Sequence, residues 1–165
     1  MENFVVHNFE PVFDKNTKIL ILGTMPSPKS REAGFYYSHP QNRFWKILSE
    51  LFREPVPTTN IDKKALLIEK RIGLWDVLKS CNIMGADDNS IKNTVPNDLS
   101  YVLNRTNISA IFTTGKKAYG LYKKYFSDTI SIPCFSLPST SPANCRFYQF
   151  DDLVKEYSII LNYLK

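Results

Sequence analysis

Residues 34 to 45 hold a dense group of side chains that could bind a planar, charged ligand. Three adjacent aromatic residues, Phe35, Tyr36 and Tyr37, are followed shortly afterwards by Asn42. An aromatic ring stacks on a planar ligand such as a nucleobase, and an amide offers both a donor and an acceptor to a base edge or to a water molecule. Three neighbouring aromatic side chains cannot all point inward from a loop, so at least one is expected to face a ligand. Asn42 has a structural alternative, which is to cap the helix that starts there.

Two further groups of residues suit a phosphate-bearing ligand. Basic residues flank the aromatic segment at positions 29, 31, 43 and 46, as expected where a polyanion is bound beside a base-sized pocket. A second loop, residues 137 to 144, contains Ser139, Thr140 and Ser141, whose hydroxyl and backbone N–H groups could contact a phosphate. Turn formation is the alternative explanation for this loop, because serine and proline are common in turns.

The pattern of apolar residues predicts the strands and helices that position these loops. Short apolar runs predict strands at 18–22, 73–78, 109–113 and 130–135, and helical spacing predicts helices at 42–53, 62–71, 115–126 and 150–164. Residues 85–90 are expected to form a polar loop. Strands that alternate with helices predict an α/β fold, a small parallel sheet covered by helices on both faces. Both candidate loops follow strands, so they are expected to open on the same edge of that sheet, where ligands of such sheets bind.

Composition narrows the class of protein. The chain has 165 residues and is expected to form one domain, residues 1–165. Its net charge of +5 is compatible with nucleic-acid binding without requiring it. Three widely spaced cysteines predict reduced thiols in a cytoplasmic protein, and no CxxC pair suggests a metal site. No segment has the length and apolar character of a membrane span, and the first residues lack the pattern of a secretory signal.

Several motifs resemble the uracil-DNA glycosylase superfamily, most closely its hypoxanthine (deoxyinosine)-DNA glycosylase branch, which is related to the mismatch-specific uracil glycosylases. The segment 23–27 (GTMPS) stands at the first motif, 34–45 (GFYYSHPQNRFW) at its continuation, and 137–144 (LPSTSPAN) at the second motif. Segments 74–78 (LWDVL), 88–91 (DNSI) and 95–98 (VPND) also match that branch. The resemblance spans most of the chain in order.

The resemblance implies a three-layer α/β/α sandwich with a four-stranded parallel sheet. It also implies a monofunctional glycosylase that flips a deaminated base out of DNA and hydrolyses its N-glycosidic bond, acting as a monomer and without a metal or another cofactor. The base-binding residues that it indicates are Gly23, Thr24, Met25, Phe35, Tyr37 and Asn42. The DNA-binding residues that it indicates are Ser27, Lys29, Arg31, Ser139, Thr140, Ser141, Pro142 and Asn144.

The chain departs from the relatives at two motif positions. Where mismatch-specific uracil glycosylases have an asparagine that holds the attacking water, this chain has Met25, and the second motif opens with Leu137 instead of histidine or asparagine. The hypoxanthine branch places its critical amide at the position of Asn42, which is therefore the first catalytic candidate. Asp76 is the second, because a carboxylate could stabilise a cationic sugar. A buried hydrogen-bonding pair is the structural alternative for Asp76.

Other functions remain open at this point. One is a different substrate, uracil or thymine opposite guanine, processed by the same chemistry. Another is a nucleic-acid-binding module on the same scaffold that has lost catalysis because Met25 replaces a polar residue. A serine hydrolase is disfavoured, since the chain has no G-x-S-x-G motif and both histidines precede every candidate nucleophile.

Overall fold

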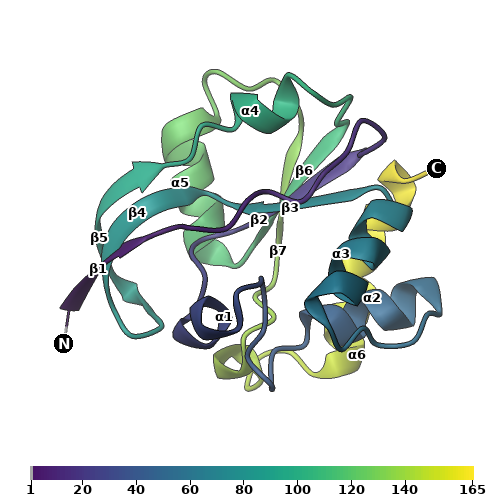
Figure 1. Cartoon of the computed structure of the whole chain (residues 1–165), viewed down its shortest axis with the longest axis horizontal. Coiled ribbons are helices and arrows are strands. Elements are labelled where there is room, and N and C mark those ends of the chain that lie inside the picture. The colour runs from purple at the N-terminus through teal and green to yellow at the C-terminus, as the bar shows by residue number, and fades with distance from the viewer. Residues whose placement is uncertain (1) are drawn as a thin grey trace.

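A four-stranded parallel sheet forms the centre of the molecule (Figure 1), as seen in a computed structural model that describes residues 2–165. Its strands are β2 (Ile19–Gly23), β3 (Ile72–Asp76), β6 (Ala110–Thr114) and β7 (Cys134–Leu137), in the spatial order β3-β2-β6-β7. Every residue of β2 is buried, as expected for a central strand covered on both faces. The predicted parallel sheet is therefore confirmed, and the last strand begins directly after Pro133, at the edge of the sheet.

Helices cover both faces of the parallel sheet. The helices are α1 (Pro28–Ala33), α2 (Phe44–Phe52), α3 (Asn60–Glu69), α4 (Ser100–Leu103), α5 (Lys116–Phe126) and α6 (Phe150–Tyr157), with 3₁₀ turns at Pro142–Asn144 and Ser158–Tyr163. Figure 1 shows α2, α3 and α6 together on one side, with α5 and α4 on the other. The expected three layers are thus present. The predicted helix over 150–164 is shorter, because its last turns are wound as a 3₁₀ helix.

A second sheet, which the sequence pattern did not predict, lies beside the first. It is antiparallel, with the order β1-β4-β5, and consists of β1 (Glu2–Val6), β4 (Leu78–Met84) and β5 (Asp87–Pro96). The prediction of a polar loop over 85–90 is wrong, since a tight turn at Gly85 reverses the chain into β5. The pattern was missed because Ile91 is the only fully buried residue of β5. One strand predicted at 73–78 is in fact divided between the two sheets.

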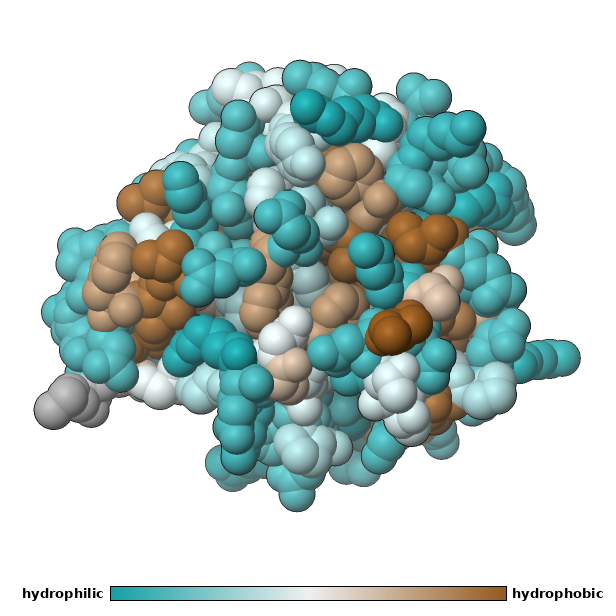
Figure 2. Space-filling view, in the orientation of Figure 1, coloured by the Kyte–Doolittle hydropathy of each residue, from teal (hydrophilic) through white to brown (hydrophobic). Residues whose placement is uncertain are grey.

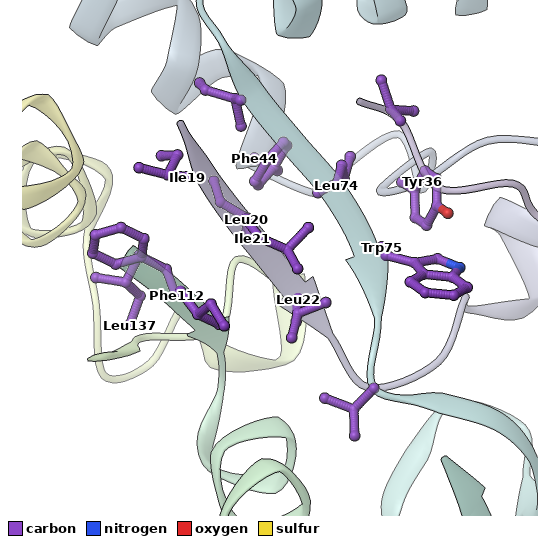
Figure 3. Packing of buried hydrophobic residues seen from close by; sticks show 14 of the residues in the cluster. Ile19, Leu20, Ile21, Leu22, Tyr36, Phe44, Leu74, Trp75, Phe112 and Leu137 are labelled. Atoms are coloured by element: carbon purple, nitrogen blue, oxygen red, sulfur yellow. The ribbon is translucent and has the colours of Figure 1, made fainter. Parts of the chain in front are cut away.

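Apolar side chains from the parallel sheet and its helices form one core (Figure 3). Leu20, Ile21 and Phe112 from the central strands are fully buried, together with Phe44 from α2 and Leu74 from β3. Apolar groups also reach the surface over the antiparallel sheet, at the left of Figure 2. Phe4, Met84 and Val95, which belong to the strands of this sheet, are exposed. Across residues 2–165, no helix has both the length and the apolar character needed to cross a membrane.

The three cysteines differ in accessibility, which gives a test of the packing. Cys145 is exposed, Cys81 is buried, and burial raises the pKa of the half-buried Cys134 thiol to about 11. Because the thiolate is the reactive form, we expect one thiol to react quickly with an aromatic disulfide reagent at pH 8 and all three after unfolding. A Cys145→Ser variant should lose the fast phase. A second fast thiol in the native protein would contradict the packing of Cys81 and Cys134.

Candidate base-binding pocket at the carboxyl edge of the parallel sheet

The candidate site is a pocket of about 310 Å³ at the carboxyl ends of the parallel strands. It lies where the strand order reverses, because the chain moves from β2 to β3 on one side and later to β6 on the other. Loops that follow β2 and β6 diverge at such a point and leave a crevice between them. The pocket is lined by Gly23, Thr24, Met25, Pro26, Ser27, Ser30, Tyr36, Tyr37, His39, Asn42, Asp76, Ile83, Gly85, Ala86, Asp88, Thr114 and residues 139–143.

Most of the predicted site residues lie in this lining. Both motif loops contribute to it, and the prediction that they open on one edge of the sheet is confirmed. Four predicted residues lie outside. The ring of Phe35 stacks on Trp45 at a centroid distance of 5.9 Å, Lys29 is exposed near Glu32, and Arg31 donates to the carbonyl of Pro26. The amide of Asn144 donates to the carbonyl of Ser139, at 2.9 Å.

The floor of the pocket is built around Gly23, the last residue of β2. A Cβ atom at this position would stand 2.5 Å from Asp76 Oδ1, 3.0 Å from Tyr37 Oη and 3.5 Å from Thr114 Oγ1. Three polar side chains from separate parts of the chain therefore converge above one strand end. Only glycine leaves room for them at this position.

Tyr37 forms one wall of the pocket. Its ring stacks on Phe44 with centroids 4.1 Å apart and planes inclined by 16°, and its hydroxyl bonds to Thr114 Oγ1 at 2.8 Å. Burial, followed by the nearby charge of Asp76, raises the pKa of the Tyr37 phenol far above its ordinary value, so the hydroxyl keeps its proton. Its backbone has a φ of 52°, a conformation that non-glycine residues adopt rarely and that recurs at functional sites.

Asn42 has its amide oxygen fully engaged within the protein. Oδ1 accepts hydrogen bonds from the backbone N–H of Phe44 at 2.9 Å and from the hydroxyl of Thr140 at 2.8 Å. These two bonds join the two motif loops and cap the start of α2. They also orient the amide, since Nδ2 must then face away from both partners. Among residues 2–165 no group accepts from Nδ2, which leaves two N–H donors on a residue of the pocket lining.

Asp76 ends β3 and lies at the bottom of the pocket with only 3% of its surface exposed. Its Oδ2 accepts from Nε2 of His7, at 2.8 Å, and its backbone carbonyl accepts from the amide of Asn97 at 2.9 Å. Asp76 therefore lies in the pocket lining and also in a buried hydrogen-bonding pair. The partner is His7, not the adjacent Trp75, whose Nε1 has no hydrogen-bond partner among residues 2–165. His7 was missed by sequence reasoning, because its partner lies 69 residues away.

The antiparallel sheet supplies a wall that sequence reasoning also missed. Ile83, Gly85, Ala86 and Asp88 reach the pocket from the β4–β5 hairpin. The segment 85–90 is polar overall, like an ordinary surface loop, and no local pattern places the hairpin opposite the two motif loops. Thr114 could have been found, because it directly follows an apolar run predicted as a strand.

Arg43 connects the two motif loops, in contrast to the prediction that it faces a polyanion. Its guanidinium donates from Nη1 to the carbonyl of Tyr148 at 2.5 Å and from Nη2 to that of Ser141 at 3.1 Å. The backbone N–H of Arg43 also donates to the carbonyl of Thr140. The planar guanidinium thus holds both ends of the segment 141–148, which a lysine could not bridge in the same way.

Replacing Arg43 by methionine should loosen this segment. We expect the free energy of unfolding to fall by about 1–3 kcal/mol, because two half-buried carbonyls lose a charged donor. Trypsin should then cut faster after Arg146, which is exposed in the same segment. Chemical denaturation and limited proteolysis measure the two effects. Lys46→Met, on the exposed face of α2, is the matched control, and equal proteolysis of both variants would contradict the role of Arg43.

Comparisons with known proteins agree with this architecture. A sequence profile of the uracil DNA glycosylase superfamily matches residues 10–165. A hypoxanthine DNA glycosylase of Methanosarcina acetivorans is 34% identical over 145 residues, which cover 87% of this chain and 90% of that protein. A hypoxanthine DNA glycosylase of Methanosarcina barkeri is 36% identical over 112 residues, which cover 67% of this chain and 71% of that protein. The solution NMR structure of a candidate uracil DNA glycosylase from M. acetivorans superimposes with a TM-score of 0.83 at 32% identity, covering 99% of both chains.

Proposed function

The chain belongs to the uracil DNA glycosylase superfamily, and from that premise we propose that it removes hypoxanthine, the deaminated form of adenine, from DNA. It acts as a monofunctional enzyme that hydrolyses the N-glycosidic bond and thereby initiates base excision repair. The observation that carries this proposal is the pocket at the sheet edge, whose lining includes both Asn42, with its unused N–H donors, and Tyr37. The names of the two curated relatives support the choice of base.

Base flipping explains why such a pocket is needed. A glycosylase cannot reach the glycosidic bond inside a stacked duplex, so it turns the target nucleotide into a pocket that replaces the lost stacking. Tyr37 is the proposed stacking surface, fixed by Phe44 behind it and by Thr114 at its hydroxyl. Phe35 supports this wall from outside the pocket, through its contact with Tyr36. Gly23, Thr24 and Met25 bound the space for the base.

Asn42 is the proposed catalytic amide. Both lone pairs of Oδ1 are used by Phe44 and Thr140, so Asn42 can act on a substrate through the hydrogens of Nδ2. A donor fixed in advance stabilises the negative charge that develops on a departing base, at no cost of reorganisation during the reaction. The backbone N–H of Met25, which has no backbone partner among residues 2–165, is a second donor candidate in the same loop.

Asp76 is the second proposed catalytic group. The charge of a carboxylate inside a pocket of low dielectric constant acts across the width of a base, and without touching the sugar it favours positive charge there as the glycosidic bond lengthens. The water that completes the reaction needs little activation when the sugar already has cationic character. If Asn42 stabilises the departing base and Asp76 stabilises the sugar, the reaction does not need a polar residue at position 25.

The DNA strand is proposed to lie across the second motif loop. Ser27, Ser139, Thr140 and Ser141 line the pocket, and the serine hydroxyls and backbone N–H groups of this loop would bind phosphates. The hydroxyl of Thr140 is used by Asn42, so Thr140 would contribute through its backbone. Asn144 braces the loop. Lys29 and Arg31 lie outside the lining and would add a more distant attraction for the strand. The segment 141–143, which includes Pro142, would fill the gap left in the duplex by the flipped nucleotide.

The proposal is tested by base release from labelled duplexes that contain inosine, uracil or a G·T mismatch, followed by alkaline cleavage. Cleavage at inosine is the expected result. Release of uracil or thymine alone would reject the substrate and retain the class of enzyme. Absence of release from every duplex, with DNA binding intact, would support the non-catalytic binding module.

We also infer that the protein acts as one domain, as a monomer, in the cytoplasm. A pocket that takes one flipped nucleotide needs residues from one chain only, and the lining described above meets that need. Sedimentation at the concentrations used for base release would show a single species of about 19 kDa. Activity that rises with the fraction of dimer would contradict this inference.

A further inference from the structure

One oxygen of the buried Asp76 carboxylate is directed at the space where a base would lie. Oδ2 is bonded to His7, whereas no group among residues 2–165 donates a hydrogen bond to Oδ1. The side chain is only 5% exposed, and Oδ1 lies above Gly23 in the pocket lining. A carboxylate oxygen that faces a pocket is stabilised by any donor that reaches it there. The geometry therefore calls for an N–H or O–H group on the molecule that enters the pocket.

His7 is held so that it can only donate to Asp76. The backbone N–H of Phe9 donates to Nδ1 of His7, at 3.2 Å, so the ring hydrogen lies on Nε2, the atom that bonds to Asp76. The backbone N–H of His7 is fixed by the carbonyl of Lys79, at 2.6 Å. Its ring packs between Phe9 and Tyr36, at centroid distances of 5.5 and 5.9 Å. Asp76 consequently presents its second oxygen to the pocket as an acceptor in a fixed orientation.

Depth in the pocket indicates which part of a nucleotide meets this oxygen. Gly23 and Asp76 are buried at the floor, whereas Gly85, Ala86 and Ala143 are exposed at the rim. A nucleotide that rotates out of a duplex enters base first, because its sugar remains joined to the strand on both sides. The far edge of the base therefore reaches Asp76.

Deamination changes the hydrogen-bonding character of that edge. In adenine the ring nitrogen N1 is unprotonated and accepts hydrogen bonds, whereas in hypoxanthine the same nitrogen carries a hydrogen next to the new carbonyl. Cytosine and uracil differ in the same way at N3. A carboxylate accepts only, so it bonds to the ring N–H of a deaminated base and repels the lone pair of the parent base.

We propose that Asp76 is the specificity-determining acceptor for the ring N–H created by deamination, and that His7 is the residue that positions it. The inference rests on the proposed function and assigns to the same pocket a means of sparing adenine and cytosine, the parent bases of hypoxanthine and uracil. It also explains why the pocket contains both kinds of group, since the Asn42 amide donates to a carbonyl and Asp76 accepts from the N–H beside it.

Exchanging Asp76 for asparagine is the direct test. The Nε2 hydrogen of His7 would hold the amide oxygen, so the amide N–H group would turn toward the pocket and replace an acceptor by a donor. We expect hypoxanthine release to fall about 10- to 100-fold, the effect of losing a hydrogen bond to a charged group. The ratio of hypoxanthine to adenine release, measured in single turnovers on matched duplexes, should fall as well. If the release of hypoxanthine and of adenine fell equally, Asp76 would act only through its charge on the sugar, and the proposal would be overturned.

Two substitutions at His7 separate positioning from packing. His7→Phe keeps an aromatic ring but removes the donor, and should lower the same ratio about 10-fold. His7→Gln restores an N–H at a similar reach and should recover most of the ratio. In an Asp76→Asn background, His7→Phe should cause no further loss of hypoxanthine release, because the two residues act through one oxygen. Additive losses would assign His7 a structural role and contradict the proposal.

A control variant and a modified substrate for the wild-type protein complete the test. Tyr125→Phe removes a hydrogen bond to Thr94 far from the pocket lining and should leave the ratio unchanged. For the wild-type protein, methylation of inosine at N1 removes the hydrogen that Asp76 is proposed to accept. Release of 1-methylhypoxanthine as fast as hypoxanthine would overturn the proposal. A protein that releases no deaminated base at all would instead refute the proposed function.

Discussion

Replacing Asn42 by aspartate is expected to leave the fold intact and to lower the rate of base release by about 10²- to 10³-fold, as for loss of one fixed donor to a developing anion. Aspartate keeps an oxygen that can accept from Phe44 and Thr140, so the cap of α2 and the link between the motif loops persist. It loses the two N–H donors and places a negative charge beside the departing base. Single-turnover release of hypoxanthine measures the effect.

Asn42→Ala provides the comparison that separates chemistry from folding. It removes the donors and the cap together, so it should lose the same activity and also about 0.5–2 kcal/mol of unfolding free energy. Asn93→Asp, on the exposed hairpin, introduces the same charge away from the pocket and should retain activity. If Asn42→Asp keeps most of its activity, the oxygen rather than the N–H group of Asn42 is the working atom.

Gly23→Ala is expected to have the second largest effect. The new methyl group would stand 2.5 Å from Asp76 Oδ1, and the Asp76 carboxylate cannot move aside without breaking its bond to His7. Overpacking of this kind costs about 1–3 kcal/mol of stability. Displacing the carboxylate and Tyr37 together should lower base release about 100-fold, as for other small misplacements of a reacting group.

The matched control for this substitution is another glycine-to-alanine change. A Cβ atom at Gly120, within α5, would meet nothing within 4 Å, and alanine is favoured over glycine inside a helix by about 0.5–1 kcal/mol. Gly120→Ala should therefore be fully active and slightly more stable in chemical denaturation. Normal base release by Gly23→Ala would mean that the floor of the pocket is looser than its geometry indicates.

The parallel sheet and the two motif loops could be predicted because local signals determine them. An unbroken apolar run marks β2, and the proline-rich segments after β2 and β7 cannot continue a strand. Loops that follow parallel strands meet at the same edge of the sheet. This is enough to predict that Asn42 and the segment 139–142 lie in one site. These inferences need no knowledge of contacts between distant residues.

The rest of the site depends on contacts that local patterns do not encode. Strand β5 has a polar sequence, since both its faces are largely exposed, and its register with β4 is interrupted by bulges. It therefore resembles a loop in sequence while forming a pocket wall. In the same way, the charge of Arg43 suggests a phosphate ligand, but the fold uses it between two carbonyls. His7 acquires its role only when β1 pairs with β4.

The pairing of β1 with β4 has a consequence for how the protein matures. His7 and Asp76 are separated by 69 residues, so closing this contact costs chain entropy that local helices and hairpins do not incur. During synthesis, β1 leaves the ribosome long before β4 exists, and it waits without a partner. Until residue 76 has been made and this contact has closed, the chain has no fixed carboxylate with which to recognise a base. The bond between Asn42 and Thr140 spans 98 residues, so competence for repair depends on two long-range contacts, and the second needs nearly the whole chain.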